Sequence, residues 1–147
     1  MIDQELLGKS LNVREEEISK WKNDPHASKR TIPVYINKDK YIDVEVYNVP
    51  LNFPIYRLEN IRTESDQESY LSRNKAVSKD FFNDPECRDA LIEQHKFLFR
   101  IANSGGDKNH FEVFKKEKFK VDEELILNSK GILLNGNTRV SALRELY

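Results

Sequence analysis

"LLNGNTRVSALREL", residues 133–146, joins an apolar stretch directly to a helical pattern through the small and polar residues at 135–139. The apolar residues after position 139 recur at helical spacing, whereas those before position 135 suit a strand. Gly136 permits a positive φ and lets the backbone approach a ligand closely. Because the first amides of a helix have no partner inside it, a strand that enters a helix in this way is suited to binding an anion such as phosphate.

The side chains of the same segment have two competing interpretations. Arg139 falls in the first helical turn, where its guanidinium can make a charge-assisted, bidentate contact with a phosphate. In the ordinary interpretation, Asn-Gly is a common turn pair, Asn137 or Thr138 is a good N-cap, and the apolar residues are the buried face of a helix. Spacing alone does not separate the two interpretations.

Length and composition exclude several classes of protein. The chain has 147 residues, which suits one domain with a short appendage, and we expect residues 1–30 to form a helical appendage and linker and residues 31–147 the domain. No apolar run approaches the roughly 20 residues that span a bilayer, and the N-terminus does not resemble a secretory signal. One cysteine, Cys87, excludes an internal disulfide and fits a cytoplasmic location. The net charge of −1 means that a polyanion site must come from a local cluster or from backbone amides.

Alternation with a period of two is clearest in residues 31–47. Apolar residues alternate there with polar ones such as Asp43 and Glu45, and the "NKDK" between the two runs is typical of a turn. We therefore expect an antiparallel hairpin with one buried face. The side chains expected to pack inward are Ile32, Val34, Ile42, Val44 and Val46.

Helical and strand patterns come in blocks along the rest of the chain. Residues 3–22 predict a helix that packs on its own domain or docks on a partner. Residues 65–103 are expected to be mostly helical, with one helix starting at Asp84 and Pro85, and residues 124–136 predict a second hairpin. This order favours an α+β fold in which a small mixed or antiparallel sheet has flanking helices.

The order of these elements, together with two short motifs, resembles the ParB/sulfiredoxin-like superfamily. In that superfamily an early strand leads to an Asn-x-Arg or Pro-Arg element, a helix and a hairpin follow, and a glycine, one or two polar residues and an arginine then open a helix. Residues 60–62, Asn-Ile-Arg, match the first motif, and residues 136–139 match the second. The resemblance covers residues 45–147. Superfamily domains usually continue past this point, so it implies a domain truncated at its C-terminal end and further domains of a longer protein.

The resemblance also implies a function. Partition proteins bind CTP at the second motif, sulfiredoxins bind ATP there, and relatives in phage-defence systems couple such a domain to the sensing of modified DNA. By resemblance, the chain is a nucleotide- or DNA-backbone-binding module of DNA partition or phage defence, and its cofactor is a nucleoside triphosphate with Mg²⁺. The phosphate-binding residues that it implies are Asn135, Gly136, Asn137, Thr138 and Arg139, with Asn60 and Arg62 approaching from the other side.

Two positions depart from the superfamily pattern. Asn137 stands where sulfiredoxins have their catalytic cysteine, so we do not expect a sulfiredoxin-type reductase, and Cys87 falls in a predicted helix where it cannot substitute. Partition proteins carry a glutamate at the position of Asn137 and an arginine at that of Thr138. The absence of both leaves nucleotide hydrolysis open.

Other candidate residues are scattered. "KKEKFK", 115–120, interleaves lysines with aromatic residues and suits contact with a nucleic-acid backbone, although such lysines are more often a solvated face. His110 with Asp107 is a candidate catalytic pair, and the carboxylates at 122–124 are candidate metal ligands of a nuclease; a surface histidine and an acidic turn are the ordinary interpretations. Because His26, His95 and His110 lie far apart in the sequence, no metal site is expected from them. The lysines of the basic cluster are Lys115, Lys116, Lys118 and Lys120.

A binding module is therefore the interpretation that we carry forward, with DNA or a nucleotide as partner and no membrane partner. One alternative is a nuclease or nucleoside triphosphatase that uses the same pocket with a divalent metal. The other is an interaction domain without a ligand, in which residues 135–139 are only a capped turn and the N-terminal helix docks on another protein. Carboxylates beside the phosphate site favour the enzyme, whereas Arg139 buried against a core acid favours the interaction domain.

Overall fold

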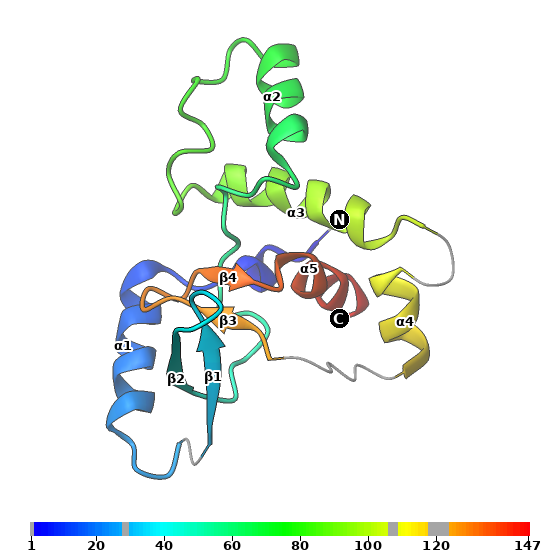
Figure 1. The fold of residues 1–147 in the computed structure, drawn as a ribbon. Coiled ribbons are helices and arrows are strands. Elements are labelled where there is room, and N and C mark those ends of the chain that lie inside the picture. The colour runs from blue at the N-terminus through cyan, green and yellow to red at the C-terminus, as the bar shows by residue number, and fades with distance from the viewer. Residues whose placement is uncertain (1, 28–29, 106–108, 118–123) are drawn as a thin grey trace.

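The protein is described by a computed structural model that covers residues 2–27, 30–105, 109–117 and 124–147 (Figure 1). An N-terminal 3-10 helix, η1, and five α-helices accompany four strands in the described residues. The helices are η1 (Gln4–Leu7), α1 (Leu11–Asn23), α2 (Glu64–Arg73), α3 (Arg88–Ala102), α4 (His110–Glu117) and α5 (Asn137–Leu146). The strands are β1 (Thr31–Tyr35), β2 (Tyr41–Glu45), β3 (Ile126–Leu127) and β4 (Leu133–Asn135).

The expected α+β class is confirmed, and the strands divide into two small sheets. β1 pairs with β2 and β3 pairs with β4, in both cases antiparallel. The segment expected to be an early strand or extended region contributes an isolated parallel bridge between Ile55 and Ile132. This bridge ties the segment that precedes Asn60 to the second hairpin, so the two motifs recognised in the sequence are brought to one side of the molecule.

The predicted first hairpin is confirmed, but its burial differs from the prediction. None of the side chains expected to pack inward is fully buried: Ile32, Val34, Val44 and Val46 are half-buried, and Ile42 is 52% exposed. The hairpin forms a two-stranded sheet of its own, and the described part of the core draws its fully buried apolar residues from other segments. A regular alternation therefore predicted the strands correctly and the burial of this face wrongly.

The N-terminal segment packs on the rest of the chain. The predicted helix at 3–22 is interrupted at Gly8, which has a φ of 114° and lies so close to the Pro54 carbonyl that a side chain there would collide with it. Leu7 is fully buried in the main core. The Arg14 guanidinium is also fully buried, where it pairs with Glu86 at 2.7 Å and donates to the Lys130 carbonyl. These contacts support the interpretation in which the segment packs on its own domain.

α3 begins later than its sequence signals predicted. Its first residue is Arg88 and its N-cap is Cys87, not Asp84. The Asp84 side chain accepts a hydrogen bond from the Glu86 amide, and its carbonyl accepts one from Cys87. Asp84 therefore closes a turn ahead of the helix instead of capping it, because an aspartate can satisfy backbone donors two residues on in either setting.

The main core gathers around the packing of α3 against α5. The predicted apolar face of α5 is present, with Val140 1% and Leu143 8% exposed. The buried members of the main cluster are Leu7, Ile55, Tyr56, Leu58, Phe82, Ala90, Leu91, Phe97, Leu98, Leu133 and Val140. Packing on both sides holds α5 in place, so the position of its first turn is determined by the core.

Candidate functional site

The strand-to-helix turn has the predicted backbone geometry. β4 ends at Asn135, Gly136 has φ 94° and ψ 14°, and α5 starts at Asn137. A Cβ atom at position 136 would overlap the Leu125 side chain, so both the positive φ and the space require glycine. The alternative in which Asn137 or Thr138 is the N-cap is wrong: Gly136 occupies that position, and no side-chain cap hydrogen bond is made.

Asn137 holds the turn against a neighbouring segment. Its side chain is 6% exposed; the Oδ1 atom accepts a hydrogen bond from the Arg57 amide at 2.9 Å, and Nδ2 donates to the Leu133 carbonyl at 3.0 Å. Both ends of the amide are thus engaged by backbone groups. Asn137 therefore positions the first turn of α5 relative to residues 57–62.

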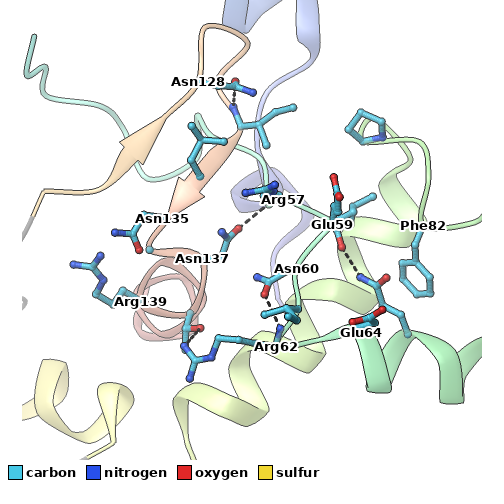
Figure 2. Close-up of a pocket in the computed structure, with 18 of the residues that line it drawn as sticks. Arg57, Glu59, Asn60, Arg62, Glu64, Phe82, Asn128, Asn135, Asn137 and Arg139 are labelled. Atoms are coloured by element: carbon cyan, nitrogen blue, oxygen red, sulfur yellow. Dashed lines mark hydrogen bonds between the residues drawn. The ribbon is translucent and has the colours of Figure 1, made fainter. Parts of the chain in front are cut away.

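The two sequence motifs meet in space. Arg62 Nη1 donates to Thr138 Oγ1 at 3.2 Å, although the residues are 76 positions apart. Asn60 Oδ1 in turn accepts a hydrogen bond from the Arg62 amide at 3.0 Å, which fixes the bend that points Arg62 toward α5 (Figure 2). The prediction that Arg62 approaches residues 136–139 from the other side therefore matches these contacts.

All seven predicted phosphate-site residues line one pocket with a volume of about 1150 Å³. Arg139 lies at one end and is half-buried, in agreement with the expectation that it is partly accessible. Figure 2 shows Arg57, Glu59 and Arg62 on one segment: Arg57 and Arg62 lie near α5, whereas Glu59 lies with Glu64 and Phe82 on the side of this segment away from α5. The predicted residues that line the pocket are Asn60, Arg62, Asn135, Gly136, Asn137, Thr138 and Arg139.

The pKa of His110 responds to two arginines of the pocket. His110, at the start of α4, lines the same pocket, and its pKa lies below the usual value. Partial burial is the largest cause, and the positive charges of Arg139 and Arg62 lower the pKa further. Both guanidiniums are therefore near enough to His110 to disfavour its protonated form.

Several pocket residues had no signal in the sequence. Arg57, Glu59 and Glu64 reach the pocket through the bend around Asn60 and the start of α2. The Arg57 amide contacts Asn137, which is 80 positions away in the sequence, so no local pattern predicted this contact. Glu59 and Glu64 are of interest because carboxylates close to the phosphate site would favour the enzyme alternative.

The remaining predicted residues lie elsewhere. Lys115 and Lys116 are exposed on α4 and do not line the pocket, whereas Lys118, Lys120, Asp107 and the carboxylates at 122–123 lie outside the described residues. Glu124 pairs with Arg30 at 2.5 Å. In the part of the chain that the structure describes, no three His, Cys, Asp or Glu side chains form a group that could hold a metal ion.

His95 belongs to the core and not to the pocket. Its Nε2 atom lies 2.6 Å from Glu145 Oε1, and its Nδ1 atom lies 2.7 Å from the Tyr56 hydroxyl. Because the carboxylate can only accept, Nε2 carries the proton and Nδ1 accepts from Tyr56. Burial lowers the pKa of His95 in spite of Glu145, which acts in the opposite direction.

Comparisons with family models, curated proteins and solved structures found no match for the chain. Among the described residues, no helix has the length and apolar character needed to cross a membrane.

Proposed function

We propose that the chain is a ParB/sulfiredoxin-like module that binds a phosphate group, of a nucleotide or of a DNA backbone, at residues 135–139. The observation that carries the proposal is the convergence of both sequence motifs on one pocket. The first turn of α5, which has no side-chain cap, lines this pocket together with Arg62 and Arg139, and both guanidiniums lower the pKa of His110. Such a combination suits a dianionic or polyanionic ligand.

The distribution of roles follows from the contacts. Gly136 supplies the positive φ at the N-cap of α5, and no side-chain cap covers the amides of the first turn. Arg62 and Arg139 supply charge from two sides, while Asn60 and Asn137 hold the two segments at the correct separation. Arg57 adds a third guanidinium to the lining of the pocket. DNA partition or phage defence would be the corresponding setting in the cytoplasm.

A hydrolytic enzyme is the second candidate, and the pocket position of Glu59 and Glu64 favours it. Mg²⁺ in phosphate-transfer sites is usually held by one or two carboxylates together with the phosphates of the substrate. Glu59 and Glu64 are the residues that would hold Mg²⁺ beside a nucleoside triphosphate. Release of inorganic phosphate from ATP, CTP or GTP in the presence of Mg²⁺, lost in Glu64→Gln, would identify this activity.

Titration of the wild type and of Arg139→Ala tests the binding proposal. The probes are the four common nucleoside triphosphates and a 20-base-pair DNA, at fixed salt and with and without Mg²⁺. We expect Arg139→Ala to weaken binding by about 1.5–3 kcal/mol, the range for hydrogen bonds to charged groups. Arg73→Ala is the matched control, because Arg73 is exposed on α2 and does not line the pocket.

Equal affinity of the wild type and Arg139→Ala for every probe would reduce residues 135–139 to a structural turn. A second readout is the titration of His110 by NMR. A bound phosphate offsets the charges of Arg139 and Arg62, so its presence should raise the pKa of His110, and binding should strengthen as the pH falls through that pKa. A steep dependence of DNA affinity on salt, without nucleotide binding, would identify the backbone as the ligand.

A further inference from the structure

The first hairpin has two edges of different character. In an antiparallel pair, residues alternate between those that exchange hydrogen bonds with the partner strand and those whose amides and carbonyls point outward. The amide of Ile36 donates to the Lys40 carbonyl at 2.8 Å, and that of Val46 donates to the Arg30 carbonyl at 3.0 Å. With the register of β1 and β2, this assigns the inward hydrogen bonds to even-numbered residues and leaves the odd-numbered residues pointing outward.

Pro33 blocks one of these edges. It lies in the middle of β1 at an outward-pointing position, where it has no amide to offer another strand. On β2 the outward-pointing residues are Tyr41, Asp43 and Glu45, each of which has a backbone donor and acceptor. All three residues are exposed, and no other segment of the described chain pairs with this edge. One edge of the hairpin is thus closed to strand addition and the other is open.

A groove of about 710 Å³ follows the open edge. On β1 it touches the alternate residues Ile32 and Val34, but on β2 and beyond it touches every residue from 43 to 51. Because consecutive residues of a strand point to opposite faces, the consecutive lining residues Asp43, Val44 and Glu45 place the groove along the edge of β2. Apolar side chains of α1, including Ile18 and Trp21, and of residues 125–127 line the rest of it.

The side chains at the open edge of β2 indicate what kind of strand could pair with it. Asp43 and Glu45 project from the exposed face of β2, and Val44 and Val46 from the half-buried face. A complementary strand would carry lysine or arginine on one face and aliphatic residues on the other, with a period of two. A second copy of β2 paired edge to edge in the register centred on Asp43 would place Asp43 against Asp43, which is unfavourable. Two basic residues, Arg30 and Lys22, also line the groove. Neither belongs to β2: Arg30 is paired with Glu124, and Lys22 lies on α1.

We propose that the open edge of β2 binds an extended segment of another protein in which basic and aliphatic residues alternate. The segment adds a third strand to the hairpin, so its backbone pairs with Tyr41, Asp43 and Glu45. Its basic side chains lie over Asp43 and Glu45, and its aliphatic side chains enter the groove against Ile18 and Trp21. The β2 edge itself does not line the phosphate pocket, and it would recruit the module to a partner through strand addition.

The test uses a fluorescein-labelled octapeptide of alternating lysine and valine and the full chain. Asp43→Pro removes the central outward amide without touching an inward hydrogen bond, just as Pro33 does on β1, and Asp43→Asn removes the charge alone. Thr31→Pro is the matched control on the other edge. We expect the octapeptide to bind the wild type and Thr31→Pro alike, to bind Asp43→Asn several-fold more weakly, and to bind Asp43→Pro at least tenfold more weakly.

Three results of the peptide titrations would overturn the proposal. They are the absence of octapeptide binding to the wild type, equal binding of a Lys-Lys-Val-Val repeat of the same composition, and unchanged binding to Asp43→Pro. Displacement of the peptide by self-association of the chain, seen by sedimentation, would also contradict it, because the occupant would then be a second copy. If Asp43→Pro does not fold, the double variant Asp43→Lys, Glu45→Lys carries the test, since both side chains are exposed and should tolerate reversal of charge.

Discussion

The two ends of α5 each carry an arginine, and the two arginines have opposite surroundings. Arg139, in the first turn, is half-buried and lines the pocket beside Arg62. Arg144, five residues later, is 2% exposed: its Nη2 atom donates to the Pro54 carbonyl at 2.6 Å, and its guanidinium lies 4.7 Å from the centre of the Tyr56 ring. One arginine lines the pocket, and the other is enclosed in the core.

The difference shows how one short helix can hold a site and a structural anchor together. Arg144 also donates to the Leu51 carbonyl at 3.0 Å, so it joins α5 to the segment that leads into the pocket bend. Its Nη1 atom is buried without a hydrogen-bond partner, which means that the enclosure of this charge carries an unrecovered desolvation cost. We therefore expect the two ends of the helix to respond differently to substitution.

The largest effect is expected for Gly136→Val. A β-branched residue at a φ of 94° is strained by about 1–3 kcal/mol, and the overlap with the Leu125 side chain forces repacking at a cost of about 1–3 kcal/mol. The free energy of unfolding should fall by the combined amount, and phosphate binding should fall more than in Arg139→Ala. Denaturant melts and nucleotide titrations measure the two quantities, and a variant as stable and as active as the wild type would contradict the role of the turn.

Arg144→Ala should lower stability more than Arg139→Ala does. Removal of the guanidinium leaves the buried carbonyls of Leu51 and Pro54 without a donor, which costs about 1–3 kcal/mol. Under conditions in which Arg144→Ala is folded, its affinity for the phosphate ligand should stay close to that of the wild type. The opposite result would contradict the comparison: Arg139→Ala would lower the free energy of unfolding more than Arg144→Ala does, and folded Arg144→Ala would lose affinity for the phosphate ligand.

The smallest effect concerns pH. Burial places the pKa of His95 below its value in the unfolded chain, so the unfolded state takes up a proton first as the pH falls. The stability contributed by neutral His95 is fully present above about pH 6.5, the ordinary histidine pKa, and is lost progressively below it. His95→Gln should flatten the decline in the free energy of unfolding between about pH 6.5 and pH 5. If the free energy of unfolding falls with pH as steeply in His95→Gln as in the wild type, His95 does not contribute to the loss of stability in acid.

Sequence reasoning predicted the local backbone of residues 135–146 better than it predicted the packing of the core. The bend at Gly136 and the helix after it were predictable because they depend on residues within a few positions of each other. The late start of α3 was missed, since Asp84 can close a turn or cap a helix with the same hydrogen bond. The exposure of Ile42 was missed because alternation defines the two faces of a hairpin but not what covers them.

The sequence by itself determined the α+β class, the pairing of residues 31–47 and the strand-to-helix turn that ends at Arg139, all of which follow from local backbone preferences and short-range periodicity. Only the tertiary structure decided that Arg62 reaches Thr138, that Arg57 and His110 join the same pocket, and that Arg144 is buried. These outcomes depend on contacts between residues dozens of positions apart, and burial changes the energy of a charge in a way that its neighbours in the chain do not indicate.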